Sequence, residues 1–194
     1  MGEKSVQKKQ FILETARKIF MEKGYKDVTM KDIVEACGIS RGGLYLYFNS
    51  TKDIFAEVLK MKNDETEDAP SGDIQEDAAA SDILALFLKE QKRELLRKKN
   101  SLTVAAYEFF FENKVAKKDN VLRTRFDDAV AVIEELITAG VESGEFYCED
   151  PFGCARNIMY VLEGLKVTAQ TVGISEKAVD DELLYIMQGL VVEE

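Results

Sequence analysis

The sequence has no histidine, no tryptophan and only two prolines among its 194 residues. Histidine is the commonest general base in enzymes and a frequent zinc ligand, so its absence counts against enzymatic chemistry and against a metal site. No hydrophobic run approaches the roughly 18 residues that a membrane-spanning helix needs. The charged first residues lead directly into a helical pattern and lack the apolar core of a signal peptide. We therefore expect a cytoplasmic protein.

Cysteine is scarce as well, because Cys37, Cys148 and Cys154 are an odd set without CxxC spacing. This pattern predicts no metal site, and we interpret all three as reduced thiols that pack in the fold. A redox-sensing role for Cys148 or Cys154 stays open as the alternative. The sequence also has no nucleophile–base arrangement and no glycine-rich phosphate loop, so neither an enzyme nor a cofactor is predicted.

Charge is abundant but unevenly distributed. The formal net charge is −10, from 26 basic and 36 acidic residues. Residues 1–62 hold 12 basic and 8 acidic residues, a balance of +4, and the remaining 14 basic and 28 acidic residues give −14. DNA binding needs positive charge only where phosphates are contacted, so this division fits a basic DNA-binding part on an acidic body. Two solvated surfaces that differ by chance are the alternative.

Apolar residues recur with the period of an α-helix along almost the whole chain, and we expect an all-α fold of about nine helices. Four are expected in the N-terminal part: residues 5–23, 30–37, 41–47 and 51–66. Five more are expected at about residues 78–99, 101–113, 120–143, 151–172 and 175–192. We place an N-terminal domain at residues 1–50 and a C-terminal domain at residues 51–194, with the fourth helix connecting them. The acidic segment 63–73, which contains Pro70, follows that helix.

Residues 29–47 have the layout of a DNA-binding helix-turn-helix: a short capped helix, a glycine-led turn and a second short helix. In the turn, Gly38 tolerates a left-handed backbone and Ser40 caps the following helix. Arg41 and Tyr45 lie four residues apart on one side of that helix, whereas Leu44 is expected to anchor it to the core. For this pattern alone, a helical bundle with surface tyrosines is the alternative.

A longer motif surrounds this layout. It consists of the segments VTMKDIV (residues 28–34), ACGIS (residues 36–40) and GGLYLYFNS (residues 42–50). Over residues 8–60 the sequence resembles the DNA-binding domain of the TetR family of one-component transcriptional regulators, the TetR/AcrR-like repressors. The resemblance implies an N-terminal three-helix helix-turn-helix domain joined to a C-terminal helical domain for ligand binding and dimerisation. Beyond residue 62 the chain is similar to the family only in length and helix count.

The resemblance also implies which residues contact DNA. An arginine at the start of the recognition helix can pair with two acceptors of guanine in the major groove. Phosphate contacts set the register and carry no sequence information. The residues expected to contact bases are Arg41, Gly42, Tyr45 and Leu46, the last with a role in the core as its alternative. The residues expected to hold phosphates are Thr29, Gly43, Tyr47, Thr51 and Lys52.

Two positions depart from the family pattern. Gly43 stands where a hydroxyl residue is common, so only its backbone is available for a phosphate. Thr51 stands where the family often has a lysine, and we expect the adjacent Lys52 to make that contact. Gly42 and Gly43 each cost about 1 kcal/mol relative to alanine within a helix. We therefore expect a recognition helix that is loosely ordered without DNA.

The C-terminal helices carry two apolar stripes. One short recognition helix specifies little sequence, so proteins of this kind bind two half-sites as dimers, and the resemblance implies a four-helix dimer interface. An intramolecular core explains both stripes equally well. The residues expected at the dimer interface are Ile158, Val161, Leu162, Leu165 and Ala169 on one helix, and Val179, Leu183, Ile186, Met187 and Leu190 on the next.

Aromatic residues are concentrated where the resemblance implies an effector pocket. Residues 109–111 are three consecutive phenylalanines, which cannot all face one core, so at least one should meet a cavity, a partner or solvent. Two glutamates lie in apolar helical stretches, and one hypothesis is that they serve a cationic ligand; exposed or ion-paired glutamates are the favoured alternative. The residues expected at the pocket are Phe87, Tyr107, Glu108, Phe110, Phe111, Phe126 and Glu163.

We expect a homodimeric repressor that binds a pseudo-palindromic operator in double-stranded DNA. We expect an apolar small molecule, with a cationic group as an open possibility, to release it. An activator or a protein-responsive regulator of the same fold is one alternative. An all-helical small-molecule binding protein with a vestigial DNA-binding head is another.

Overall fold

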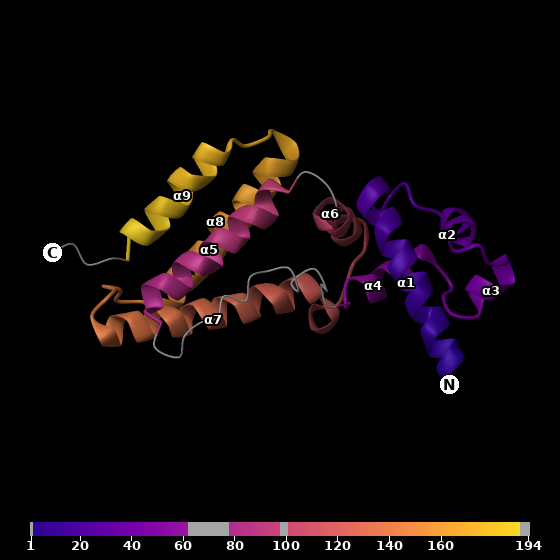
Figure 1. The fold of residues 1–194 in the computed structure, drawn as a ribbon, viewed down its shortest axis with the longest axis horizontal. Helices are drawn as coiled ribbons and strands as arrows, with labels where there is room; N and C mark the ends of the chain where they lie inside the picture. Colours follow the sequence, from indigo (N-terminus) through magenta and orange to yellow (C-terminus); the bar gives the residue numbers. More distant parts are fainter. Residues whose placement is uncertain (1, 62–77, 98–100, 191–194) are drawn as a thin grey trace. The chain divides into compact units, whose positions relative to one another are not determined.

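The structure, a computed structural model, describes residues 2–61, 78–97 and 101–190. Within these ranges the chain forms nine α-helices and one short 3-10 turn, so the prediction of an all-α fold with about nine helices is confirmed (Figure 1). Contacts divide the chain into unit 1, Met1–Asn63 with Lys98–Val121, and unit 2, Asp64–Arg97 with Leu122–Glu194. Among the described residues, none of the helices has the length and apolar character to cross a membrane.

Unit 1 is built around its first helix. This helix, α1 (Glu3–Lys23), packs against α2 (Met30–Cys37), α4 (Thr51–Val58) and α6 (Thr103–Glu112). The short α3 (Arg41–Tyr45) packs on α2, and the 3-10 turn spans Lys117–Asp119. The buried side of α1 carries Ile12, Leu13, Ala16, Ile19 and Phe20, which follow a helical period as the sequence predicted.

An aromatic cluster joins α6 to the N-terminal helices of unit 1. The Phe109 ring lies 5.0 Å from the Tyr25 ring in an edge-on arrangement and 5.2 Å from the Phe55 ring. Phe20 lies edge-on to Phe55 at 4.6 Å. The expected boundary after residue 50 made α4 a connecting helix and put α6 in the C-terminal domain, whereas their contacts place both in unit 1. The reason is that α6 supplies an aromatic side chain that the short N-terminal helices need to close their core.

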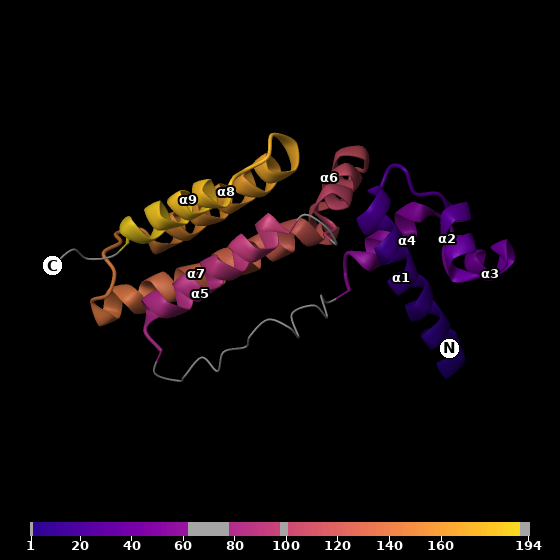
Figure 2. The same cartoon turned by 45° about the horizontal axis from the view of Figure 1, so that its top comes forward.

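Unit 2 contains α5 (Ala80–Leu96), most of α7 (Val121–Ser143), α8 (Pro151–Thr171) and α9 (Glu176–Gln188). Figure 2 shows α8 and α9 together in one layer and α5 and α7 in the other. Across the layers, α5 packs against both α8 and α9. The core between them is aliphatic, and Leu84, Ile133, Ile137, Leu162 and Val179 are fully buried in it.

The two apolar stripes expected at a dimer interface line this core. Six of the ten residues are buried within the single chain: Ile158, Leu162, Leu165, Val179, Leu183 and Leu190. The other four are partly buried and pack against the same core: Val161, Ala169, Ile186 and Met187. Packing within one chain thus accounts for the apolar character of both stripes, which was the alternative to a dimer interface.

Residues 144–150 connect α7 to α8 and bind several helices of unit 2. The Glu145 carboxylate accepts hydrogen bonds from the backbone N–H groups of Ala80 and Ser81, at 3.3 and 3.0 Å, and from the Ser81 hydroxyl at 2.8 Å. It thereby satisfies N–H groups at the start of α5, which have no partner inside their own helix. These bonds, with that from the Ser143 hydroxyl, lower the pKa of Glu145 to about 2.

The stability of unit 2 should consequently depend on pH through Glu145. A lowered pKa in the folded state means that the carboxylate contributes its full stabilisation above its ordinary pKa of 4.5 and loses it as the pH falls toward about 2. Glu145→Gln is expected to lower the melting temperature at pH 7 and to flatten its fall between those two pH values. Circular dichroism melts across this range check it, with the exposed Glu142→Gln as control. A Glu145→Gln profile identical to that of the wild type would contradict the assignment.

Candidate nucleic-acid interface

The first helix of the helix-turn-helix, α2, begins with a complete capping box. The Thr29 hydroxyl accepts a hydrogen bond from the Asp32 N–H at 3.2 Å, and the Asp32 carboxylate accepts one from the Thr29 N–H at 2.9 Å. Ile33 and Cys37 form its buried side. The helix ends at Gly38, whose φ of +62° lies in the left-handed region that favours glycine.

The turn after Gly38 orients the recognition helix α3. The Ser40 hydroxyl accepts a hydrogen bond from the Gly43 N–H at 3.1 Å, which caps α3. Leu44 is fully buried and Phe48 is nearly so, and both hold the short helix against unit 1 as expected. The predicted three-part layout is therefore present, although α3 ends at Tyr45 instead of Tyr47.

The opposite side of α3 is exposed. Tyr45 has 51% and Leu46 83% of its surface accessible, and Arg41 and Gly42 are exposed as well. The large exposed fraction of Leu46 leaves it no part in the core, which was the alternative role considered for it. All four residues expected to contact bases thus lie outside the packed interior, around the side of α3 away from Leu44.

The positions expected to hold phosphates differ in what they can offer. The Thr29 hydroxyl and N–H both interact with Asp32, and the Gly43 N–H is used by Ser40. The Tyr47 hydroxyl, half-buried, accepts a hydrogen bond from Ser5 at 3.5 Å. Thr51 is half-buried at the first position of α4, and Lys52 beside it is exposed. Lys52 is thus the one positively charged residue of these five positions, and its side chain is accessible.

Asp32 holds the end of α1 against the start of α2. Lys23 donates a hydrogen bond to its carboxylate at 2.6 Å. This bond and those from Thr29 keep the pKa of Asp32 far below its usual range. Lys23 is the last residue of α1, and Asp32 lies in the first turn of α2. The ion pair therefore orients α2 against α1, and it engages one of the lysines of unit 1.

Glu108 of α6 binds the turn that follows α1. Its carboxylate accepts hydrogen bonds from the backbone N–H groups of Tyr25, at 2.6 Å, and Lys26, at 3.1 Å. Asn113 donates to the Tyr25 hydroxyl at 3.3 Å, and Lys26 lies 3.8 Å from the Glu112 carboxylate. The sequence suggested Glu108 as a ligand residue, but its partners are backbone amides of unit 1. Only contacts between residues more than 80 positions apart could have indicated this role.

Assigning α6 to unit 1 also sharpens the charge asymmetry. Residues 98–121 hold five basic and three acidic residues, which raises the balance of unit 1 from +4 to +6. The net charge of −10 is then the sum of +6 on unit 1 and −16 on unit 2. The unit that presents α3 is thus the basic one, as phosphate binding requires.

Comparison with known proteins decides the family. The sequence model of the bacterial regulatory proteins of the tetR family matches residues 12–58, which contain α2, the turn and α3. The model of the tetracyclin repressor-like C-terminal domain matches residues 83–180. The chain belongs to the tetR family. It is a DNA-binding transcriptional regulator, and the family is one of regulatory proteins and not of enzymes.

Two relatives and one solved structure illustrate the likeness. The HTH-type transcriptional regulator YfiR of Bacillus subtilis strain 168 is 30% identical over 141 residues, which are 72% of this chain and 68% of that protein. The fatty acid metabolism regulator protein of the same organism is 27% identical over 135 residues, 69% and 68% of the two chains. A transcriptional regulator from Saccharomonospora viridis, in complex with choline, has a TM-score of 0.79 at 21% identity, covering 97% of this chain and 100% of that one. At this identity the structure shows a shared fold.

The residues expected at the effector pocket of this tetR-family regulator are distributed over both units. Tyr107, Glu108, Phe110 and Phe111 belong to unit 1, and Phe87, Phe126 and Glu163 to unit 2. Of the three consecutive phenylalanines, Phe109 is buried, Phe110 is half-buried and Phe111 has 87% of its surface exposed. At least one of the three was expected to leave the core, and Phe111 does so.

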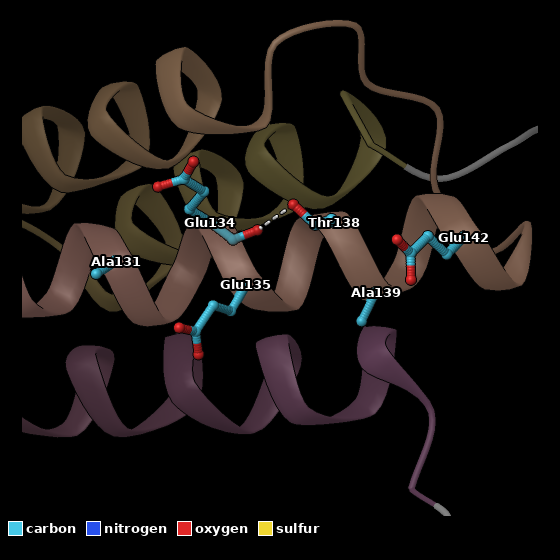
Figure 3. A pocket seen from close by; sticks show the side chains of 6 residues that line it. All are labelled: Ala131, Glu134, Glu135, Thr138, Ala139 and Glu142. Carbon is cyan, nitrogen blue, oxygen red and sulfur yellow. Dashed lines mark hydrogen bonds between the residues drawn. The ribbon is translucent and has the colours of Figure 1, made fainter.

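In unit 2 the expected pocket residues have neighbours within the unit. Phe87 and Phe126 pack partly buried against the core, and the Phe126 ring lies 5.4 Å from that of Tyr160. Glu163 pairs with Lys166 at 2.9 Å. A separate surface hollow lies along α7 and contains none of these residues (Figure 3). It is lined by Ala131, Glu134, Glu135, Thr138, Ala139 and Glu142.

Gly42 provides a direct test of the exposed side of α3. A Cβ atom at Gly42 would meet nothing within 4 Å, so the fold of unit 1 does not require glycine there. Gly42→Ala is expected to raise the free energy of unfolding by up to about 1 kcal/mol, because alanine favours the helix. It is also expected to weaken operator binding, because the methyl group separates α3 from the DNA. Urea unfolding and fluorescence anisotropy measure the two effects.

Gly43→Ala is the matched comparison for this test. Its Cβ would lie 3.2 Å from the Ser40 hydroxyl, so we expect it to disturb the cap and to gain less stability than Gly42→Ala. If Gly42→Ala bound DNA as tightly as the wild type, close approach at this position would be disproved.

Proposed function

We propose that this tetR-family regulator is a homodimeric repressor that binds a pseudo-palindromic operator and releases it when a small molecule binds. The observation that carries the DNA-binding part is the exposed side of α3, where Arg41, Tyr45 and Leu46 are accessible while Leu44 fixes the helix from behind. Arg41 offers two donors to guanine, and Leu46 offers an apolar contact for a thymine methyl group.

Backbone N–H groups at the start of α3 complete the proposed contact. The first N–H groups of a helix have no partner inside it, and Ser40 accepts only that of Gly43. Those of Arg41 and Gly42 are thus the amides we assign to the DNA, with Lys52 as the nearby phosphate-binding cation. Thr29 contributes to phosphate binding in this proposal only if Asp32 releases its hydroxyl or N–H.

Dimerisation follows from the size of the recognition helix. A five-residue helix contacts few base pairs, so two copies are needed to define a site. We assign the interface to exposed apolar residues on the outer sides of α8 and α9: Phe152, Tyr160, Val167, Leu184 and Tyr185. Gly164 supports this choice because it is exposed and a Cβ atom there would meet nothing within 4 Å, which leaves room for a partner helix.

Introducing negative charge on this surface tests the dimer. Tyr160 and Tyr185 have 61% and 67% of their surface exposed, so glutamate at both positions should not disturb the fold of one chain. The double variant Tyr160→Glu, Tyr185→Glu is expected to halve the mass measured by light scattering and to weaken operator binding. Val132→Glu, on the exposed surface of α7, is the control and should stay dimeric. If the double variant remained a dimer, the interface would not lie on the outer sides of α8 and α9.

The proposed effector is a molecule with an apolar body. Phe87 and Phe126 supply partly buried aromatic surface in unit 2. One relative is a fatty acid metabolism regulator, and the S. viridis regulator was solved with choline, so an acyl chain and a quaternary ammonium group are the two chemistries to compare. Since Glu163 is paired with Lys166 and Glu108 with backbone amides, the acyl chain is the class we favour.

Within unit 1, helix α6 supports the helices that carry the residues we assign to DNA. Glu108 and Asn113 hold the turn at Tyr25 and Lys26, and Phe109 fills the core of the same unit. An effector that displaces α6 therefore has to displace this turn or break its hydrogen bonds. Either change alters the support of α1 and thereby of α2 and α3.

Selection of bound DNA from a random pool is the decisive experiment. The proposal predicts a pseudo-palindrome whose half-sites are centred about one helical turn, roughly 34 Å, apart. Anisotropy of this DNA is then measured while a long-chain fatty acid, an acyl-CoA or choline is added, and a fatty acid or its thioester is expected to release it. Absence of any selected palindrome would contradict the repressor. Release by choline alone would replace the acyl effector by a cationic one.

A further inference from the structure

The first two turns of α1 carry polar residues where the rest of the helix carries core residues. Ser5 and Lys9 lie four residues apart. They continue the side of α1 that carries Ile12 and Ala16 in the core. Both are half-buried, whereas Lys8 beside them is exposed. Their role is therefore set by specific contacts and not by burial of apolar surface.

Lys9 contacts two elements of unit 1 besides its own helix. Its ammonium nitrogen lies 5.5 Å from the ring centre of Phe48, which follows the end of α3 and has only 4% of its surface exposed. An ammonium group over an aromatic ring is attracted by the negative face of that ring. The same nitrogen donates a hydrogen bond to the Glu57 carboxylate of α4 at 3.2 Å. Lys9 thereby joins α1, the segment after α3 and α4.

Ser5 makes a second contact with the segment after α3. Its hydroxyl donates a hydrogen bond to the Tyr47 hydroxyl at 3.5 Å. Tyr47 directly precedes Phe48 and is one of the residues expected to hold a phosphate. The first two turns of α1 thus contact two consecutive residues at the point where α3 ends. We call these contacts of Ser5 and Lys9 the α1 brace.

Helix α3 is too short to keep its orientation alone. Of its five residues, all of which the structure describes, Leu44 is the buried one. The backbone N–H groups of Tyr47 and Phe48 both donate to the Leu44 carbonyl, at 2.9 and 3.1 Å. The α1 brace therefore holds the two residues whose amides are bonded to the last turn of α3. A movement of these residues is passed directly to the backbone of α3.

We propose that Lys9 is a positioning residue for DNA binding, which holds the end of α3 through Phe48 and Glu57. This inference rests on the proposed contact of α3 with DNA. The charge of Lys9 is engaged inside unit 1, so phosphate binding is left to Lys52. Without the charge of Lys9, the fraction of protein with α3 in position falls, and the apparent affinity for DNA falls in proportion.

Lys60 provides a matched comparison on the same carboxylate. It donates a hydrogen bond to the other oxygen of Glu57 at 3.0 Å, and it is exposed. This hydrogen bond lowers the pKa of Glu57, and that from Lys9 adds to the effect. Lys60 lies only three residues after Glu57, so its bond does not link α4 to α1. The two lysines therefore share a charge and an acceptor but differ in what they join.

Anisotropy titrations at several salt concentrations test the proposal with Lys9→Met, which removes the charge and keeps an unbranched side chain. The variant is expected to bind the selected operator and its single-base variants alike, about three- to tenfold more weakly than the wild type, because a partly exposed ion pair and ring contact are each weak. Its slope of log affinity against log salt should equal that of Lys60→Met. Lys60→Met should bind within about twofold of the wild type. Lys9→Arg, which can make both contacts of Lys9, should do so too.

Amide hydrogen exchange of the free protein tests the α1 brace without DNA. In Lys9→Met the amides of residues 44–48 are expected to exchange about three- to tenfold faster, because the end of α3 opens more often. Those of residues 12–20 in the core of α1 should keep the rate of the wild type. Since this measurement needs no operator, failure of the proposed repressor and failure of the α1 brace are seen separately.

Three outcomes would contradict the role of Lys9. A salt slope lower by about one than that of Lys60→Met would make Lys9 a phosphate contact. Equal affinities of Lys9→Met and Lys60→Met would leave the contact with Phe48 without effect on DNA binding. Faster exchange throughout unit 1, instead of at residues 44–48, would show that Lys9 supports only the stability of the unit.

Discussion

Replacing Phe109 by alanine is expected to lower the free energy of unfolding of unit 1 by about 3–5 kcal/mol, as for other buried phenylalanines. Only 3% of its surface is exposed, and its ring contacts those of Tyr25, Phe55 and Phe110. Loss of the ring leaves a cavity between α6 and the N-terminal helices. Operator binding should fall as well, because the same core supports α1 and, through it, α2 and α3.

Phe111→Ala is the matched control, two positions away on the same helix. Because 87% of the Phe111 surface is exposed, Phe111→Ala should change the free energy of unfolding by no more than about 0.5 kcal/mol. Urea unfolding followed by far-ultraviolet circular dichroism suits a chain without tryptophan. Equal effects of the two substitutions, or an unperturbed Phe109→Ala variant, would contradict the placement of α6 in unit 1.

Arg41→Ala is expected to cost about 1–3 kcal/mol of operator binding, roughly a ten- to hundredfold loss of affinity. A bidentate arginine–guanine pair specifies a base, so the loss should be confined to operators with guanine at one position of each half-site. Anisotropy titrations against the selected operator and its single-base variants measure this. The variant should bind the altered sites almost as well as the original one.

Lys52→Ala separates phosphate binding from base recognition. It should weaken binding to all of these DNAs alike and reduce the slope of log affinity against log salt by about one. If Arg41→Ala behaved in the same uniform way, Arg41 would be a phosphate contact and the assignment of α3 to base recognition would need another residue.

Features that depend on residues three or four positions apart could be predicted without the structure. The caps of the two helices of the helix-turn-helix, at Thr29 and Ser40, are present, with each side chain accepting an N–H from three residues later. The left-handed Gly38 and the buried Leu44 follow from the same local chemistry. This is why the helix-turn-helix and the exposure of Arg41 and Tyr45 were predicted correctly.

Helical periodicity shows that one side of a helix is buried but not what buries it. The stripes of α8 and α9 fitted a dimer interface or an intramolecular core equally well, and within one chain they line the core of unit 2 with α5 and α7. The outer sides of the same helices carry Tyr160 and Tyr185. The apolar residues on these outer sides recur less regularly along the sequence than the core residues do. The choice between the two sides depends on which helices pack against them.

The amino-acid sequence alone sufficed for the family, the all-α class and the chemistry of the DNA-binding motif, because these rest on short-range hydrogen bonds and a contiguous motif. Tertiary structure decided that α6 belongs to unit 1, that Glu108 holds the Tyr25–Lys26 backbone and that Phe109 is the buried member of three phenylalanines. These contacts join residues 54 to 84 positions apart, and no local pattern of side chains specifies a partner at that distance.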